Sequence, residues 1–184
     1  MGHKYAITNK EGVYFITFAT VGWIDVFTRK AYRDLLIENL RYCQRHKGLV
    51  LYAWCIMTNH VHLVAEAKGQ NLSDILRDFK SYTAKLLITA LQQPGESRRE
   101  WMLPLFRAAG EVNGNNTTFQ FWQQDNHYKE VHSQAFAFQK FDYIHNNPVE
   151  TGLVERAEDY PYSSARDLYY GKRCGLLEVK FWDE

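Results

Sequence analysis

The chain has 184 residues, of which 46% are hydrophobic and 23% charged, and this composition excludes intrinsic disorder, collagen-like repeats and coiled coils. The 22 Lys and Arg residues almost balance the 21 Asp and Glu residues. The net charge of +1 excludes nucleic-acid binding through bulk charge, so any such binding must come from a local patch. The length predicts a single domain over residues 1–184.

Cysteine usage and the amino terminus indicate a cytoplasmic protein. Cys43, Cys55 and Cys174 are odd in number and form no C-x-x-C pair, which favours reduced thiols over disulfides or zinc ligands. Residues 1–10 are polar, which argues against a secretion signal. The longest apolar run, Leu49–Met57, is far shorter than the roughly 20 residues that span a bilayer, so we expect no membrane contact.

The first half of the chain predicts three strands and two helices from its hydrophobic periodicity. The strands are expected over 12–22, 49–57 and 60–67, and the helices over 29–47 and 72–91. Thr28 and Asn71 are placed to cap the two helices, and Gly48 is placed to end the first.

The second half begins with a polar, Gly- and Asn-rich stretch, residues 92–118, which predicts a long surface excursion that could form a hairpin. Residues 119–124 could add a further strand. Ser133 is placed to cap a helix over residues 134 to about 147, which Pro148 is expected to end. The order β-α-β-β-α-β followed by an extra helix predicts an α+β fold, a ferredoxin-like sandwich with an antiparallel sheet.

The tripeptide His60-Val61-His62 is the most informative motif. Alternate residues of a strand share a face, so His60, His62 and Glu66 point one way while the residues between them are apolar. We expect the two imidazoles on the open face of the sheet, with Cα atoms about 7 Å apart, where they can converge on one divalent ion. The spacing alone also suits two ordinary polar residues beside a turn.

A second group of chemically capable residues lies on the predicted last helix. Tyr143 and Asn147 are four residues apart and therefore share a helix face, so a phenol lies one turn from an amide oxygen that could complete a metal site. The alternative is that Tyr143 packs at the edge of the core and Asn147 only ends the helix before proline.

Three segments together resemble a known family. Trp54–Val64 (WCIMTNHVHLV) is similar to the strand and metal motif of the HUH single-tyrosine transposases of bacterial insertion sequences. Trp122–His127 (WQQDNH) and Asp142–Val154 (DYIHNNPVETGLV) resemble its REP-associated branch, which also includes domesticated transposase-like proteins. The resemblance implies an extra C-terminal helix that carries the nucleophilic tyrosine.

The resemblance also implies roles for individual residues. His60 and His62 correspond to the metal ligands and Tyr143 to the nucleophile. Asn147 stands where better-known relatives have a glutamine as third ligand, and Glu66 is a candidate substitute on the histidine face.

Three other residues compete for roles or could assist. Tyr82 also lies on a predicted helix, but its neighbour four residues on is Leu86, which cannot bind a metal, so Tyr143 is the preferred nucleophile. His127 and His145 could help to activate the phenol, although both could simply be surface histidines.

The implied reaction is cleavage of single-stranded DNA at a hairpin-flanked site by transesterification, through a covalent 5′-phosphotyrosine. A divalent metal, Mg²⁺ or Mn²⁺, would act in it, although imidazoles also accept zinc or nickel. The phosphodiester energy is conserved, so no nucleotide cofactor is expected, and the sequence has no phosphate-binding glycine loop.

Basic and aromatic residues are candidate DNA contacts. The basic ones are Arg33, Arg41, Arg77, Lys80, Lys85, Arg98 and Arg99. Aromatic residues make up 15% of the chain, and exposed ones could stack on unpaired bases. The alternative is a solvated basic face with the aromatic residues in the core.

Three other functions compete with the transposase interpretation. They are a catalytically silent, domesticated DNA-binding regulator, a metal-dependent phosphoesterase that forms no covalent adduct, and a replication-initiator-like nickase. The sequence leaves open whether the protein is a monomer or a homodimer, and whether the tyrosine serves its own subunit.

Overall fold

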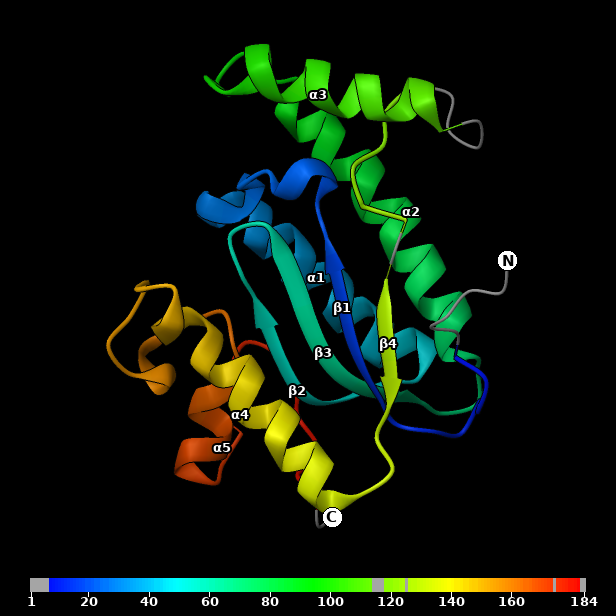
Figure 1. The fold of residues 1–184 in the computed structure, drawn as a ribbon, viewed down its shortest axis with the longest axis vertical. Coiled ribbons are helices and arrows are strands. Elements are labelled where there is room, and N and C mark those ends of the chain that lie inside the picture. The colour runs from blue at the N-terminus through cyan, green and yellow to red at the C-terminus, as the bar shows by residue number, and fades with distance from the viewer. Residues whose placement is uncertain (1–6, 114–117, 125, 174, 183–184) are drawn as a thin grey trace.

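The computed structural model describes residues 7–113, 118–124, 126–173 and 175–182. A four-stranded antiparallel sheet with the order β2-β3-β1-β4 forms its centre (Figure 1). The strands are β1 (Tyr14–Ala19), β2 (Leu49–Ile56), β3 (His60–Ala67) and β4 (His127–Glu130). This order, with helices between the strands, confirms the predicted ferredoxin-like α+β fold.

Helices cover both faces of the sheet. In Figure 1, α1 and α2 lie behind the sheet and α4 crosses in front of it, while α3 lies across one end. The helices are α1 (Lys30–Lys47), α2 (Leu72–Leu91), α3 (Arg99–Val112), α4 (Gln134–Glu150) and α5 (Ala165–Tyr170). Short 3-10 turns occupy Val21–Trp23, Val26–Thr28 and Ala157–Asp159.

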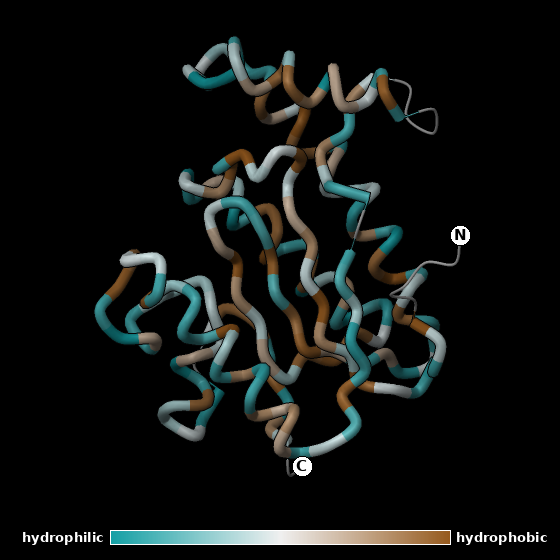
Figure 2. The backbone as a smooth tube through the Cα atoms, viewed as in Figure 1, coloured by the Kyte–Doolittle hydropathy of each residue, from teal (hydrophilic) through white to brown (hydrophobic). Residues whose placement is uncertain are grey.

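Strand alternation divides the core between the two faces of the sheet. Val61 and Leu63 of β3 are buried, and Phe18 of β1, on the same face, packs edge-on against Phe79 of α2. The hydrophobic colour in Figure 2 is concentrated on the central strands. The next residues along β3 point to the other face, so His60 and His62 lie on the side of α4.

Three of the four predicted helix-capping residues are confirmed. Ser133 caps α4 by accepting a hydrogen bond from the Phe136 N–H. Gly48 ends α1 in the left-handed conformation (φ 73°), and Asn71 caps α2 by accepting a hydrogen bond from the Ser73 N–H. Thr28 does not cap α1, because its hydroxyl donates to the Asp25 carbonyl and accepts from Arg98.

The expected hairpin in the 92–118 stretch is wrong, because most of that stretch is the helix α3; residues 114–117 lie outside the described part. Met102, Phe106 and Gly110 are buried at four-residue spacing. A Cβ on Gly110 would meet the Phe119 backbone at 3.0 Å, so glycine permits the close approach of the following segment. The Gly- and Asn-rich flanks obscured this apolar stripe.

Two further predictions need correction. Residues 119–124 form only a single bridge, Thr20 with Trp122, and the fourth strand is the later β4. Pro148 does not end α4, which continues to Glu150. A proline in the last turn of a helix loses one hydrogen bond, and the Thr151 N–H still reaches the Asn147 carbonyl.

Cys43 and Cys55 are buried free thiols, and Cys174 lies outside the described residues. Among the helices of the described ranges, none combines the length and the apolar character needed to cross a membrane.

Candidate metal and nucleophile site

Two imidazoles of β3 converge on one point. The Nε2 atoms of His60 and His62 are 2.9 Å apart, and their ring centroids are separated by 4.5 Å. Alternation along the strand brings both rings to one face, where both nitrogens can bind the same cation.

The outer nitrogen of each ring has a partner that fixes its orientation. His60 Nδ1 lies 2.6 Å from Asn59 Oδ1, and the Asn59 amide nitrogen donates to the carbonyl of Trp23. Asn59 Oδ1 is therefore an acceptor and His60 Nδ1 carries the hydrogen, which leaves the Nε2 lone pair available. His62 Nδ1 lies 2.8 Å from the Thr17 hydroxyl on the neighbouring strand, an arrangement typical of metal-binding histidines.

Burial keeps both rings neutral at pH 7. It lowers the pKa of His60 to about 4, against a smaller opposing effect of Asp25. Burial and the neighbouring His60 lower the pKa of His62 well below its usual value. Because a neutral imidazole is the form that binds metals, the site is prepared for a cation.

The prediction that the histidine face is open is wrong, because α4 packs against β2 and β3. His62 is only 2% exposed. The same helix brings Asn147 Nδ2 to 3.5 Å from His62 Nε2, and places the Tyr143 ring centroid 5.3 Å from that of His62. Tyr143 itself is 44% exposed, so its phenol remains accessible.

The donor set fits a divalent ion if the third protein ligand is an amide oxygen. Among the described residues, no group of three His, Cys, Asp or Glu side chains could hold a metal. Rotation of the Asn147 amide would present Oδ1 beside His62. Glu66 lies four residues beyond His62, about 13 Å along the strand, and its carboxylate is 3.6 Å from Lys180 Nζ.

The three other candidate residues lie in different places. His127 is paired with Thr17 and therefore lies on the sheet face that carries His62, whereas Tyr82 and His145 point elsewhere. Tyr82 is exposed on α2, where with Tyr42 it lines a groove between α1 and α2, on the opposite side of the sheet from His62. His127 is exposed on β4, directly opposite Thr17. His145 is buried rather than on the surface, and its Nε2 lies 2.8 Å from the Ser164 hydroxyl.

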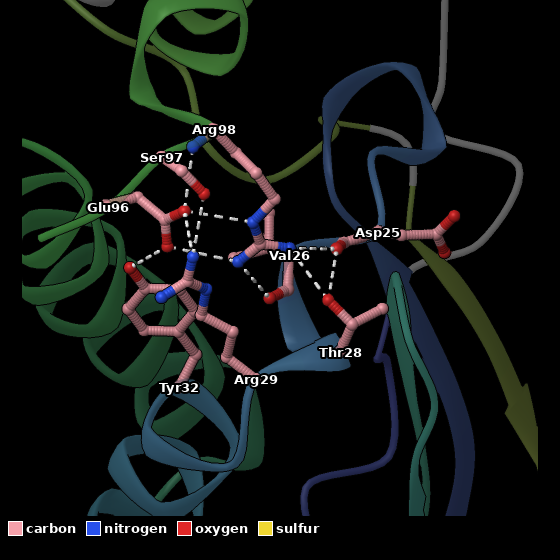
Figure 3. Close-up of polar contacts among 8 residues, drawn as sticks. All are labelled: Asp25, Val26, Thr28, Arg29, Tyr32, Glu96, Ser97 and Arg98. Carbon is pink, nitrogen blue, oxygen red and sulfur yellow. Dashed lines mark hydrogen bonds and ion pairs between the residues drawn. The ribbon is translucent and has the colours of Figure 1, made fainter.

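Most of the basic residues predicted to contact DNA have partners inside the protein. Arg33 stacks on Tyr162, Arg41 donates to the Leu176 carbonyl, Arg77 pairs with Asp74 and Asp78, and Lys80 donates to the Gln123 carbonyl and Asn126. Arg98 binds the buried carboxylate of Glu96 (Figure 3). For Lys85 and Arg99, the described residues provide no hydrogen bond or ion pair.

Sequence reasoning missed residues that contact the candidate nucleophile. Lys140 Nζ lies 5.6 Å from the Tyr143 ring centroid, and the ring of Phe15 meets both Tyr143 and His62 at centroid distances of 5.9 Å. The three-residue spacing of Lys140 and Tyr143 on one helix was the available signal. Phe15 is brought in by strand pairing, which no local pattern reveals.

Comparison with known proteins adds a family and a fold. Residues 12–102, about half of the chain, match the family described as "Transposase IS200 like". The solved structure of a REP-associated tyrosine transposase bound to a REP hairpin is 18% identical, with a TM-score of 0.66 over 98% of this chain and 92% of that one. That similarity shows a shared fold.

A crystal structure of a protein described as a transposase from Deinococcus radiodurans R1 is 25% identical, covering 79% of this chain and 95% of that one, with a TM-score of 0.46. No curated protein sequence matches the chain. The family match includes His60 and His62, and Tyr143 and Asn147 lie beyond it. The chain belongs to the IS200-like transposase family, through the segment that carries β1, α1, β2, β3 and α2.

Proposed function

We propose that this protein is a metal-dependent endonuclease and strand transferase for single-stranded DNA, which cleaves next to a hairpin through a covalent 5′-phosphotyrosine. Membership of a transposase family supports DNA cleavage and joining in general. The observation that carries the specific proposal is the convergence of His60 and His62 at 2.9 Å beside Tyr143, in a single chain.

His60, His62 and Asn147 would hold the cation, Mg²⁺ or Mn²⁺. When bound, such an ion polarises a phosphate and offsets the charge that develops in the transition state. Thr17 and Asn59 hold the two rings in the orientation that this requires.

Tyr143 supplies the nucleophile. Its phenolic oxygen forms a bond to phosphorus, the bond between phosphorus and the 3′ oxygen breaks, and the phenolic proton leaves as the 3′ oxygen gains one. The products are a 5′-phosphotyrosine and a free 3′ hydroxyl. Attack by a second 3′ hydroxyl reverses the step and joins new ends, so the reaction needs no nucleotide cofactor.

Two observations bear on substrate and assembly. The fold is shared with a protein whose solved structure contains a REP hairpin, which supports hairpin DNA as the substrate class. Tyr143 lies beside His62 of its own chain, which supports use of the tyrosine within one subunit, in a monomer or in each half of a homodimer.

The test is covalent capture. A labelled DNA hairpin with single-stranded flanks is incubated with the protein and Mn²⁺, and the mixture is resolved on a denaturing gel. We expect a labelled protein–DNA adduct that disappears with Tyr143→Phe and persists with Tyr82→Phe, because Tyr82 lies across the sheet.

Three results would overturn the proposal. Cleavage without an adduct would indicate a phosphoesterase, and DNA binding without cleavage would indicate a domesticated regulator. An adduct that survives Tyr143→Phe would assign the nucleophile to another residue.

A further inference from the structure

The β4 side of the candidate site carries two lysine side chains, Lys129 and Lys140. Helix α4 packs mainly against β2 and β3, while β4 forms the sheet edge beyond β1 (Figure 1). Lys129 of β4 is exposed and stands directly opposite Phe15 of β1. Residues opposite each other in an antiparallel pair point to the same face, so Lys129 lies on the face that carries His62.

Lys140 of α4 occupies the same region. Its ammonium lies 5.0 Å from the ring centroids of Phe15 and Phe136 and 5.6 Å from that of Tyr143. Phe15 links the two residues, because it lies directly opposite Lys129 and its ring centroid is 5.0 Å from the Lys140 ammonium. Burial and the charge of Lys129 lower the pKa of Lys140. Two like charges are therefore held together beside the candidate nucleophile.

Neither charge is neutralised within the described ranges, where no carboxylate forms an ion pair with Lys129 or Lys140. Aromatic rings attract a cation through their faces but carry no net negative charge. Arg77 and Arg98, on the other side of the sheet, differ because both have carboxylate partners. An anion that enters next to Tyr143 meets two unpaired ammonium groups.

We propose that Lys140 and Lys129 bind backbone phosphates of the single-stranded DNA that adjoins the scissile bond, and so hold that strand over β4 beside Tyr143. The inference rests on the proposed function, because it assumes a DNA substrate. An ammonium acts on phosphate oxygens as a point charge, which suits a backbone contact that does not read sequence.

Lys140→Met is the decisive variant, because methionine keeps an apolar stem against the three rings and removes the charge. It is compared with Lys140→Arg, Lys129→Gln and the control Lys68→Gln, which removes an exposed charge just after the end of β3. All are made in the Tyr143→Phe background, so that DNA binds without reacting. The probes are a DNA hairpin with a ten-nucleotide oligothymidylate flank and the same hairpin without the flank.

Binding is measured by fluorescence anisotropy over a series of salt concentrations. For the flanked probe, we expect the slope of log K against log salt to become about 0.7 shallower for each lost contact. In the variant that combines Lys140→Met with Lys129→Gln, the slope should become about 1.4 shallower. Lys140→Arg and Lys68→Gln should keep the original slope. Binding of the flankless hairpin should not change.

An unchanged slope in Lys140→Met and Lys129→Gln would overturn the inference, and so would an equal loss for both probes. These outcomes are separate from the test of the proposed function. If the protein with Tyr143 intact still forms the covalent adduct, only the phosphate contacts are wrong. If it forms no adduct and binds neither probe, the proposed function fails as well.

Discussion

The two faces of the sheet use the same kinds of side chain for different purposes. On the α1–α2 side, Arg98 and Lys80 have partners inside the protein, and buried hydroxyls such as that of Thr83 bond to neighbouring groups of the fold. On the α4 side, Lys140 packs against aromatic rings and has no carboxylate partner among the described residues, and the Thr17 hydroxyl supports a histidine. Whether a basic residue can bind a ligand therefore depends on its neighbours, which a count of basic residues cannot show.

The largest expected effect that tests this contrast is the loss of stability on removing Arg98. Glu96 is 3% exposed and binds Arg98, Arg29 and the hydroxyl of Tyr32 (Figure 3). Arg98→Ala should lower the free energy of unfolding by about 3 kcal/mol, because it leaves a buried carboxylate with fewer partners. Urea denaturation measures the loss.

The matched control is Arg77→Ala. The partners Asp74 and Asp78 are exposed, so this variant should change the free energy of unfolding much less than Arg98→Ala does. DNA binding by folded Arg98→Ala should be unchanged. If instead Arg98→Ala unfolds as easily as the original protein but loses DNA binding, Arg98 is a DNA contact and the contrast between the faces fails.

Two threonines on opposite faces give a smaller and more specific test. Thr17→Val removes the partner of His62 Nδ1 and should weaken Mn²⁺ binding about 10- to 100-fold, as is usual for groups that orient metal ligands. Thr83→Val removes the acceptor of the buried Trp122 indole N–H, so it should reduce stability by about 1–3 kcal/mol without changing Mn²⁺ affinity. Calorimetric titration and urea denaturation measure the two effects, and equal Mn²⁺ affinities in the two variants would contradict the role given to Thr17.

Much of the fold was predictable, because local signals decide where most elements begin and end. The alternation of apolar and polar residues over 60–67 predicted β3 with the bounds that the structure shows. Gly48 marked the end of α1 and Asn71 the start of α2. Helix α3 was missed because only two of its side chains, those of Met102 and Phe106, are buried and its flanks are rich in turn formers. The fourth strand was misplaced because β4 has only four residues and lies at the sheet edge.

The candidate site was less predictable. His60 and His62 follow from strand alternation, and Tyr143 and Asn147 from helical spacing, because these pairs are local. Contacts between distant segments gave no such signal. Thr17, Phe15 and Lys129 enter the site only through the pairing of β1 with β3 and β4.

The smallest expected effect is a change in how the free energy of unfolding depends on pH. Burial by itself would raise the pKa of the Glu96 carboxyl, but hydrogen bonds from Arg98 and Tyr32 outweigh it and lower that pKa to about 2 from its usual 4.5. The charged carboxylate therefore stabilises the folded protein above pH 4.5, and this stabilisation is lost as the pH falls toward 2. After allowance for solvent screening, the contribution lost between pH 6 and pH 3 should be about 1 kcal/mol. Glu96→Gln, which does not titrate, should show a correspondingly flatter decline of urea stability with acid, and an equally steep decline would show that the network does not favour the charged carboxylate.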